Sequence, residues 1–149
     1  MIDTLQKLFK RDLNKLINEV ESYTYENLLW KVDKDISNSA GNLCLHLVGN
    51  LNTFIGKELG GTSYIRNREL EFSLKDIPRP ELIKMIKDTV DVVEVALSKL
   101  KEDDLKEKYP LIVFEQEMTT EYFLIHLSTH LAYHLGQINY HRRLLNNIK

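Results

Sequence analysis

Residues 119–149 constrain the fold more than any other part of the sequence. Four of the five histidines of the protein lie in this stretch, separated by 4, 4 and 7 residues: His126, His130, His134 and His141. On a helix that turns by about 100° per residue, these side chains and Gln137 fall within a stripe about 80° wide. Leu127, Leu131 and Ile138 lie directly beside the stripe, so its edge should be buried. The pattern predicts a long helix that packs against its neighbours along a row of imidazoles.

Apolar residues with helical spacing recur in three earlier segments, and no segment alternates as a β-strand does. Ser37-Asn-Ser39 supplies N-cap candidates for the second helix and Gly60-Gly61 ends it, while Pro78 suits the first turn of the third. Thr119 or Thr120 is expected to cap the last helix. The predicted helices cover approximately residues 3–22, 39–59, 78–100 and 119–149. The sequence therefore predicts an all-α protein with a single domain over residues 1–149, an up-and-down-type four-helix bundle with long connecting loops.

Two connections stand out between the predicted helices. Residues 60–77 form the longest irregular piece and contain Arg66 and Glu71, and connections of this length are uncommon unless they are functional or disordered. Residues 109–114 are apolar and β-branched but too short to form a sheet alone. We expect them to form an extended segment laid across the bundle.

Charge and cysteine content exclude several classes of partner. The formal net charge is −2 and both signs are interspersed, which gives no basic surface for nucleic acid or an anionic membrane. No apolar run approaches 18 residues, and the N-terminal residues lack the core of a signal peptide. Cys44 is the only cysteine, so no intramolecular disulfide can form. We expect a soluble, cytoplasmic protein.

Histidines on two helices point to a metal site. His130 and His134 lie four residues apart and can bind one ion from a single helical turn, while His46 lies on the core face of the second helix. Three imidazoles leave a coordination position open for water or substrate. The predicted ligands are therefore His46, His130 and His134, and the ion is a divalent metal such as zinc, nickel or iron. Hydrogen-bonded histidines of an ordinary core are the alternative interpretation.

Other polar residues near the stripe have two interpretations each. His126 is expected to pack beside the site or to orient a ligand, since a fourth ligand would close the coordination sphere. Asn50 and Gln137 could orient a ligand or substrate, or make a hydrogen bond in the core. Tyr133 could line a pocket or pack at a helix seam. His141, near the end of the last helix, is expected at the surface or as a C-terminal cap.

Two segments resemble the DinB/YfiT-like superfamily of small four-helix metalloproteins: Leu45-His46-Leu-Val-Gly-Asn50 and His130-Leu-Ala-Tyr-His134-Leu-Gly-Gln137-Ile. The similarity covers nearly the whole chain, and the ending Gln137-Ile-Asn-Tyr-His-Arg142-Arg143-Leu looks like an uncharacterised branch. The resemblance implies that one histidine of the second helix and two of the last helix bind a divalent metal, roles that fall on His46, His130 and His134. It also implies a homodimer. Characterised members are metal-dependent transferases and isomerases that use low-molecular-weight thiols such as bacillithiol or mycothiol.

The residues favour some reactions over others. Position 131 is leucine, so the His-Glu-x-x-His motif of metalloproteases is absent and no general base is apparent. No residue is therefore assigned as catalytic. A metal can still ionise a bound thiol, which favours a thiol-dependent S-transferase or isomerase acting on a small electrophilic substrate. The alternative is a non-catalytic metal-binding bundle that serves as a scaffold, sensor or binding module. In either case metal binding should weaken in acid, because a protonated imidazole cannot bind metal.

Overall fold

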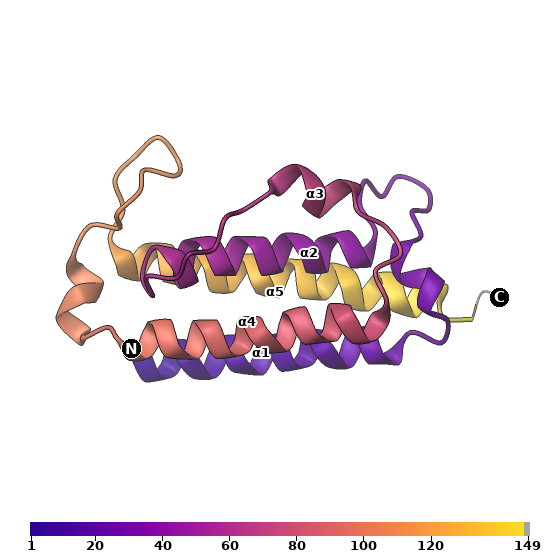
Figure 1. The fold of residues 1–149 in the computed structure, drawn as a ribbon, viewed down its shortest axis with the longest axis horizontal. Coiled ribbons are helices and arrows are strands. Elements are labelled where there is room, and N and C mark those ends of the chain that lie inside the picture. Colours follow the sequence, from indigo (N-terminus) through magenta and orange to yellow (C-terminus); the bar gives the residue numbers. More distant parts are fainter. Residues whose placement is uncertain (148–149) are drawn as a thin grey trace.

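Helices account for most of the chain in the computed structural model, which describes residues 1–147 (Figure 1). The predicted domain and the predicted last helix both extend to Ile148 and Lys149, which lie outside the described residues. The α-helices are α1 (Ile2–Ser22), α2 (Ala40–Leu51), α3 (Arg68–Ser73), α4 (Arg79–Ser98) and α5 (Thr120–Leu145). Shorter elements are the 3₁₀ turns η1 (Glu26–Trp30) and η3 (Glu102–Lys106) and the π-helical turn η2 (Asn52–Lys57), which continues α2. The predicted all-α fold is confirmed.

Side-chain caps explain where the two helices of the site begin. The Ser39 hydroxyl accepts a hydrogen bond from the backbone N–H of Asn42 at the start of α2, and Thr119 accepts one from Tyr122 at the start of α5. Both residues were N-cap candidates in the sequence. After η2 the chain turns at Gly60-Gly61, where Gly61 has a φ of 72° that favours glycine.

The four long helices form a bundle whose directions are fixed by contacts at their ends. Arg142 near the end of α5 pairs with Glu19 near the end of α1, so these two helices run in the same direction. Arg79 at the start of α4 donates to the carbonyl of Tyr23 just after α1, so α4 runs the opposite way. α2 is antiparallel to α5 and therefore parallel to α4 (Figure 1). The helices thus do not alternate strictly up and down, because residues 58–78 cross back along the bundle between α2 and α4.

α2 is covered by neighbouring elements along its whole length. It packs against α4 and α5, and the crossover places α3 against it as well. Every residue of α2 is buried as a result, and its apolar side chains join those of the other long helices in one core. No helix within residues 1–147 has both the length and the apolar character needed to cross a bilayer.

The two connections singled out in the sequence differ from what we expected. Within residues 60–77 the chain forms α3, and the side-chain amide of Asn42 holds it by donating to the carbonyls of Glu71 and Leu74, each at 2.9 Å. In the 109–114 segment Tyr109 is buried and its hydroxyl donates to the carbonyl of Phe54, but Ile112 is 67% exposed. That segment is mostly an exposed loop at the end of the bundle, so the prediction that it lies across the helices is wrong.

Candidate metal centre

His46, His130 and His134 converge between α2 and α5. The Nε2 atom of His130 lies 3.3 Å from that of His46 and 3.1 Å from that of His134. One ring nitrogen from each residue lies within 4.8 Å of the other two. The three rings are close to mutually perpendicular, with interplanar angles of 76°, 87° and 88°. The two helices therefore direct three imidazole nitrogens at one point.

The spacing of these nitrogens is compatible with a shared metal ion. For nitrogens at about 2.0–2.1 Å from a metal, neighbouring ligands lie about 3.3–3.4 Å apart in a tetrahedral sphere and about 2.9 Å apart in an octahedral one. The two short separations, 3.1 and 3.3 Å, fall within this range. A neutral imidazole carries only one N–H, and converging lone pairs repel unless a cation lies between them. The donor set is neutral imidazole, which suits zinc, nickel and iron alike.

Hydrogen bonds on the far side of two rings set their tautomers. Nδ1 of His46 lies 3.1 Å from Oε1 of Glu71, and Nδ1 of His134 lies 2.7 Å from Oε1 of Gln137. Both acceptors are oxygens, so we assign the ring proton to Nδ1 in each case. Nε2 then presents its lone pair to the converging point, which is the form that a metal requires.

Glu71 is itself held by Arg66. The guanidinium donates to both carboxylate oxygens, from Nε at 2.8 Å and from Nη2 at 2.9 Å, in a two-pronged pair. Glu71 is only 6% exposed, and this burial raises the pKa of its carboxyl. The hydrogen bonds from His46 and Arg66 and the positive charge of Arg66 outweigh burial, so the pKa of Glu71 lies below its ordinary value. Glu71 is therefore a carboxylate, the stronger acceptor for the Nδ1–H of His46.

Gly49 allows this carboxylate to reach α2. A Cβ added at position 49 would lie 1.9 Å from Oε2 of Glu71 and 3.3 Å from Nε of Arg66. Gly49 is one helical turn beyond His46, so the missing side chain leaves the space into which the Glu71–Arg66 pair fits. A larger residue here would displace the acceptor of a predicted metal ligand.

Burial keeps two of the converging histidines, His130 and His134, neutral. Burial, followed by the neighbouring imidazoles, lowers the pKa of His130 to about 4. Burial also lowers the pKa of His134, although the hydrogen bond with Gln137 opposes it in part. Both rings are therefore neutral at pH 7 in the metal-free protein and need not lose a proton to bind metal.

The stability of the metal-free protein should fall between about pH 6.5 and pH 4. An unfolded imidazole has a pKa of about 6.5, whereas that of His130 is lowered to about 4 in the fold. Below pH 6.5 the unfolded chain therefore binds more protons, and the free energy of unfolding decreases as pH falls. Urea unfolding after metal chelation, at half-unit pH steps, measures this slope. His130→Gln should have a shallower slope, and an unchanged slope in that variant would contradict the assignment.

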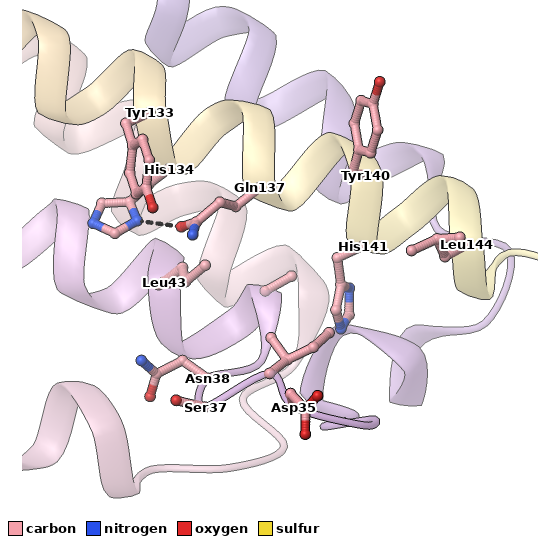
Figure 2. Close-up of a pocket in the computed structure, with 12 residues that line it drawn as sticks. Asp35, Ser37, Asn38, Leu43, Tyr133, His134, Gln137, Tyr140, His141 and Leu144 are labelled. Carbon is pink, nitrogen blue, oxygen red and sulfur yellow. Dashed lines mark hydrogen bonds between the residues drawn. The ribbon is translucent and has the colours of Figure 1, made fainter.

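A cavity of about 560 Å³ opens beside His134. It lies between α5 and the segment that leads into α2, with Leu43 on one side and Tyr133 and Gln137 on the other (Figure 2). Its volume is within the usual range of about 300–1,000 Å³ for small-molecule sites. Of the three converging histidines only His134 lines it, so a ligand in this cavity would approach the centre from the His134 side.

The other residues that the sequence singled out differ in how close they lie to the three converging histidines. His126 is not among the converging residues; its ring packs 4.8 Å from that of Phe114, measured between centroids. Gln137 bonds to His134, and Tyr133 is 65% exposed at the cavity. Asn50 is buried one turn beyond His46.

The expectation that His141 lies at the surface or caps the helix is wrong, because its side chain is buried. Its Nδ1 atom lies 2.6 Å from the Tyr23 hydroxyl, and its Nε2 atom lies 2.8 Å from the carbonyl oxygen of Lys31.

Sequence reasoning missed Glu71, Arg66 and Gly49 as parts of the site. Arg66 and Glu71 lie in the irregular connection that the sequence marked as unusual, but their spacing carries no sign of a histidine partner 25 residues away. Gly49 carried one available signal, because an isolated glycine inside a helical pattern costs about 1 kcal/mol relative to alanine and often marks a close approach.

Comparison with known proteins gives a family. A family model described as "Protein of unknown function (DUF1572)" matches residues 1–149, the whole chain. A search of curated proteins found no match.

Proposed function

The chain belongs to the DUF1572 family, and from this premise we propose that it is a divalent-metal-dependent enzyme of the DinB/YfiT-like superfamily, acting as a thiol-dependent S-transferase or isomerase on a small electrophilic substrate. The observation that carries the proposal is the convergence of three imidazole nitrogens, two of them with oxygen partners at Nδ1. A three-nitrogen site leaves a coordination position open for a reactant.

Each part of the site has a separate role in this proposal. His46, His130 and His134 would hold the ion, while Glu71 and Gln137 keep two of these rings in the metal-binding tautomer. When bound, the divalent ion supplies Lewis acidity and lowers the pKa of a coordinated thiol or water. The cavity beside His134 would bind the electrophile and exclude water from it.

The position of the carboxylate supports thiol chemistry over hydrolysis. Glu71 contacts His46 on the Nδ1 side, away from the converging Nε2 atoms, and both of its oxygens are occupied by Arg66. It is therefore not placed to accept a proton from a reactant. A thiol ionises more readily than water and depends less on such a base.

Metal analysis and a thiol assay test the proposal together. We expect purified protein to contain about one zinc, nickel or iron ion per chain. We also expect metal-loaded protein to accelerate the reaction of bacillithiol, mycothiol or cysteine with a chlorinated aromatic electrophile above the rate with free metal. The His134→Ala variant is the control. Metal-loaded protein with no acceleration for any thiol would contradict the enzymatic proposal.

One observation favours a second candidate function. Two of the three converging histidines, His46 and His130, do not line the cavity. Because a ligand in the cavity would contact only one of the three histidines, the second candidate function is a non-catalytic metal-binding bundle that serves as a scaffold, sensor or binding module. In that case bound zinc should raise the melting temperature without any thiol turnover.

A cytoplasmic location is part of the proposal. Cys44 is a free thiol, and burial raises its pKa to about 12. A thiol of this kind is unreactive and behaves as a small apolar side chain. The only cysteine is a buried core residue and not part of a disulfide, as is typical of proteins in a reducing compartment such as the cytoplasm.

We further propose that the protein is a homodimer through the outer face of α5. Tyr133 and Tyr140 on this face are each 65% exposed, and Leu144 is 71% exposed. These three residues also border the cavity beside His134, so a second copy on this face would lie at the edge of that cavity. Gly136 lies between the two tyrosines in the sequence, and no atom of the described residues lies within 4 Å of a Cβ added there. Glycine in a helix costs about 1 kcal/mol relative to alanine, and no contact among residues 1–147 requires it at this position. A helix of a second copy could approach closely at this point.

Gly136→Glu should convert the dimer to a monomer, because a buried unpaired carboxylate opposes association. Size-exclusion chromatography with light scattering measures the mass. Val95→Glu is the matched control, since it places the same charge at an exposed apolar position of α4. We expect it to leave the mass unchanged. A monomeric mass for the wild-type protein at micromolar concentration would contradict the dimer proposal.

A further inference from the structure

His130 is the one converging histidine whose far nitrogen lacks a partner. Its Nδ1 atom is buried and has no hydrogen bond with any of residues 1–147, whereas the Nδ1 atoms of His46 and His134 both face oxygens. If Nε2 of His130 binds a metal, Nδ1 must carry the proton. A buried N–H without an acceptor costs about 1–3 kcal/mol. Metal-bound His130 therefore requires a hydrogen-bond acceptor at Nδ1. His46 and His134 each already have one.

Asn50 carries a buried acceptor without a donor. The residue is 7% exposed, and its Oδ1 atom has no hydrogen-bond partner in the described part of the chain. A missing donor at Asn50 and a missing acceptor at His130 are complementary deficits. Each unsatisfied group destabilises the fold, and one hydrogen bond between Nδ1–H of His130 and Oδ1 of Asn50 would satisfy both.

Helix register places these two residues at the same level of the bundle. On α2 and its extension η2, Asn50 lies midway between His46 and Phe54, four residues from each. His46 faces His130 and His134 on α5, and the ring of Phe54 lies 5.2 Å from that of Phe123. Because the helices are antiparallel, Asn50 lies opposite the turn between residues 126 and 130. On the helical wheel of α2, Asn50 lies about 40° from His46.

We infer that Asn50 is the positioning residue for His130, with its side-chain carbonyl accepting the Nδ1–H bond directly or through one bridging water. The inference rests on the proposed metal site. Each converging histidine then has its own oxygen partner: Glu71 for His46, Gln137 for His134 and Asn50 for His130. Such partners fix the orientation of a metal ligand, and their loss typically costs about 10–100-fold in metal affinity. An ordered water serves nearly as well as a direct bond where two buried polar groups are too far apart.

Two substitutions at position 50 separate positioning from packing. Asn50→Leu removes the acceptor with a side chain of similar size, and Asn50→Asp keeps an acceptor and strengthens it. We expect Asn50→Leu to lower zinc affinity about tenfold, measured by competition with a chromophoric chelator. The melting temperature of its metal-free form should not fall, since the lost carbonyl has no partner there. Asn50→Asp should bind zinc at least as tightly as wild type.

Thr53→Val is the matched control. The Thr53 hydroxyl is also buried without a hydrogen-bond partner among the residues that the structure describes, but it lies seven residues beyond His46. We expect wild-type zinc affinity in this variant. NMR of zinc-loaded protein with ¹⁵N-labelled histidine adds a direct readout, because the Nδ1–H proton of His130 should exchange slowly in wild type and fast in Asn50→Leu.

Three outcomes would overturn the inference. Wild-type zinc affinity in Asn50→Leu would remove the role of Asn50 and leave the metal site intact. A fall in metal-free melting temperature that accounts for the whole loss of affinity would show that Asn50 acts only in packing. Absence of zinc binding by the wild-type protein would remove the proposed metal site together with the inference.

Discussion

Replacing His130 with alanine should lower zinc affinity by about 100-fold or more. The Nε2 atom of His130 is the one that lies close to both other nitrogens, at 3.3 Å from His46 and 3.1 Å from His134. Binding of zinc to four-ligand sites contributes about 10–16 kcal/mol, or about 3 kcal/mol for each ligand, and 1.4 kcal/mol corresponds to a factor of ten. Competition with a chromophoric chelator measures the dissociation constant, and the visible spectrum of cobalt-substituted protein reports the change in ligand number.

The metal-free form of this variant should remain folded. Within residues 1–147, Nδ1 of His130 has no hydrogen-bond partner. Burial also disfavours the charged ring and lowers the pKa of His130 to about 4. Its removal should therefore affect metal-free unfolding much less than zinc binding. The rise in melting temperature that zinc causes in wild type should be largely lost.

His126→Ala is the matched control for this experiment. His126 lies one turn earlier on the same helix and packs against Phe114 rather than at the converging point. We expect its zinc affinity to stay within about twofold of wild type. Equal losses in His126→Ala and His130→Ala, or tight zinc binding in both, would falsify the assignment of ligands.

Gly49→Ala should weaken both the fold and the metal site. The added Cβ would lie 1.9 Å from Oε2 and 2.6 Å from Cδ of Glu71, so the carboxylate must leave its place on α2. Displacement separates it from Nδ1 of His46 and disturbs its pair with Arg66. Overpacking costs about 1–3 kcal/mol, and loss of an oriented carboxylate costs about tenfold or more in metal affinity. Urea unfolding and zinc competition measure the two effects.

Two comparisons isolate the cause of this effect. Gly136→Ala makes the same change in α5, where no atom of residues 1–147 lies within 4 Å of the added Cβ. Measured at a concentration where the protein is monomeric, alanine there should stabilise the helix by up to about 1 kcal/mol. In a Glu71→Ala background the clash at position 49 is absent, so Gly49→Ala should cost much less than in wild type. Additive effects of the two substitutions would mean that Gly49 does not act through Glu71.

Particular elements show which features local sequence encodes. The predicted helices at 3–22 and 78–100 match α1 and α4 to within about two residues, because apolar spacing and proline placement act locally. Ser39 and Thr119 cap α2 and α5 as expected, since a cap bonds only to the next few residues. By contrast, α3 has six residues, too few for a periodic signal. Its position depends on Asn42 and His46, both about thirty residues earlier.

Sequence alone determined the helical class of this protein and the common face of His130 and His134, because both follow from a period of 3.6 residues within one segment. His46 was linked to that pair only as a hypothesis, by its place on a second apolar face and by the family resemblance. Tertiary structure decided the remainder: the crossover of residues 58–78, the carboxylate of Glu71 behind His46 and the burial of His141. These features depend on contacts between distant segments and on the absence of a side chain at Gly49, and no local periodicity records such contacts.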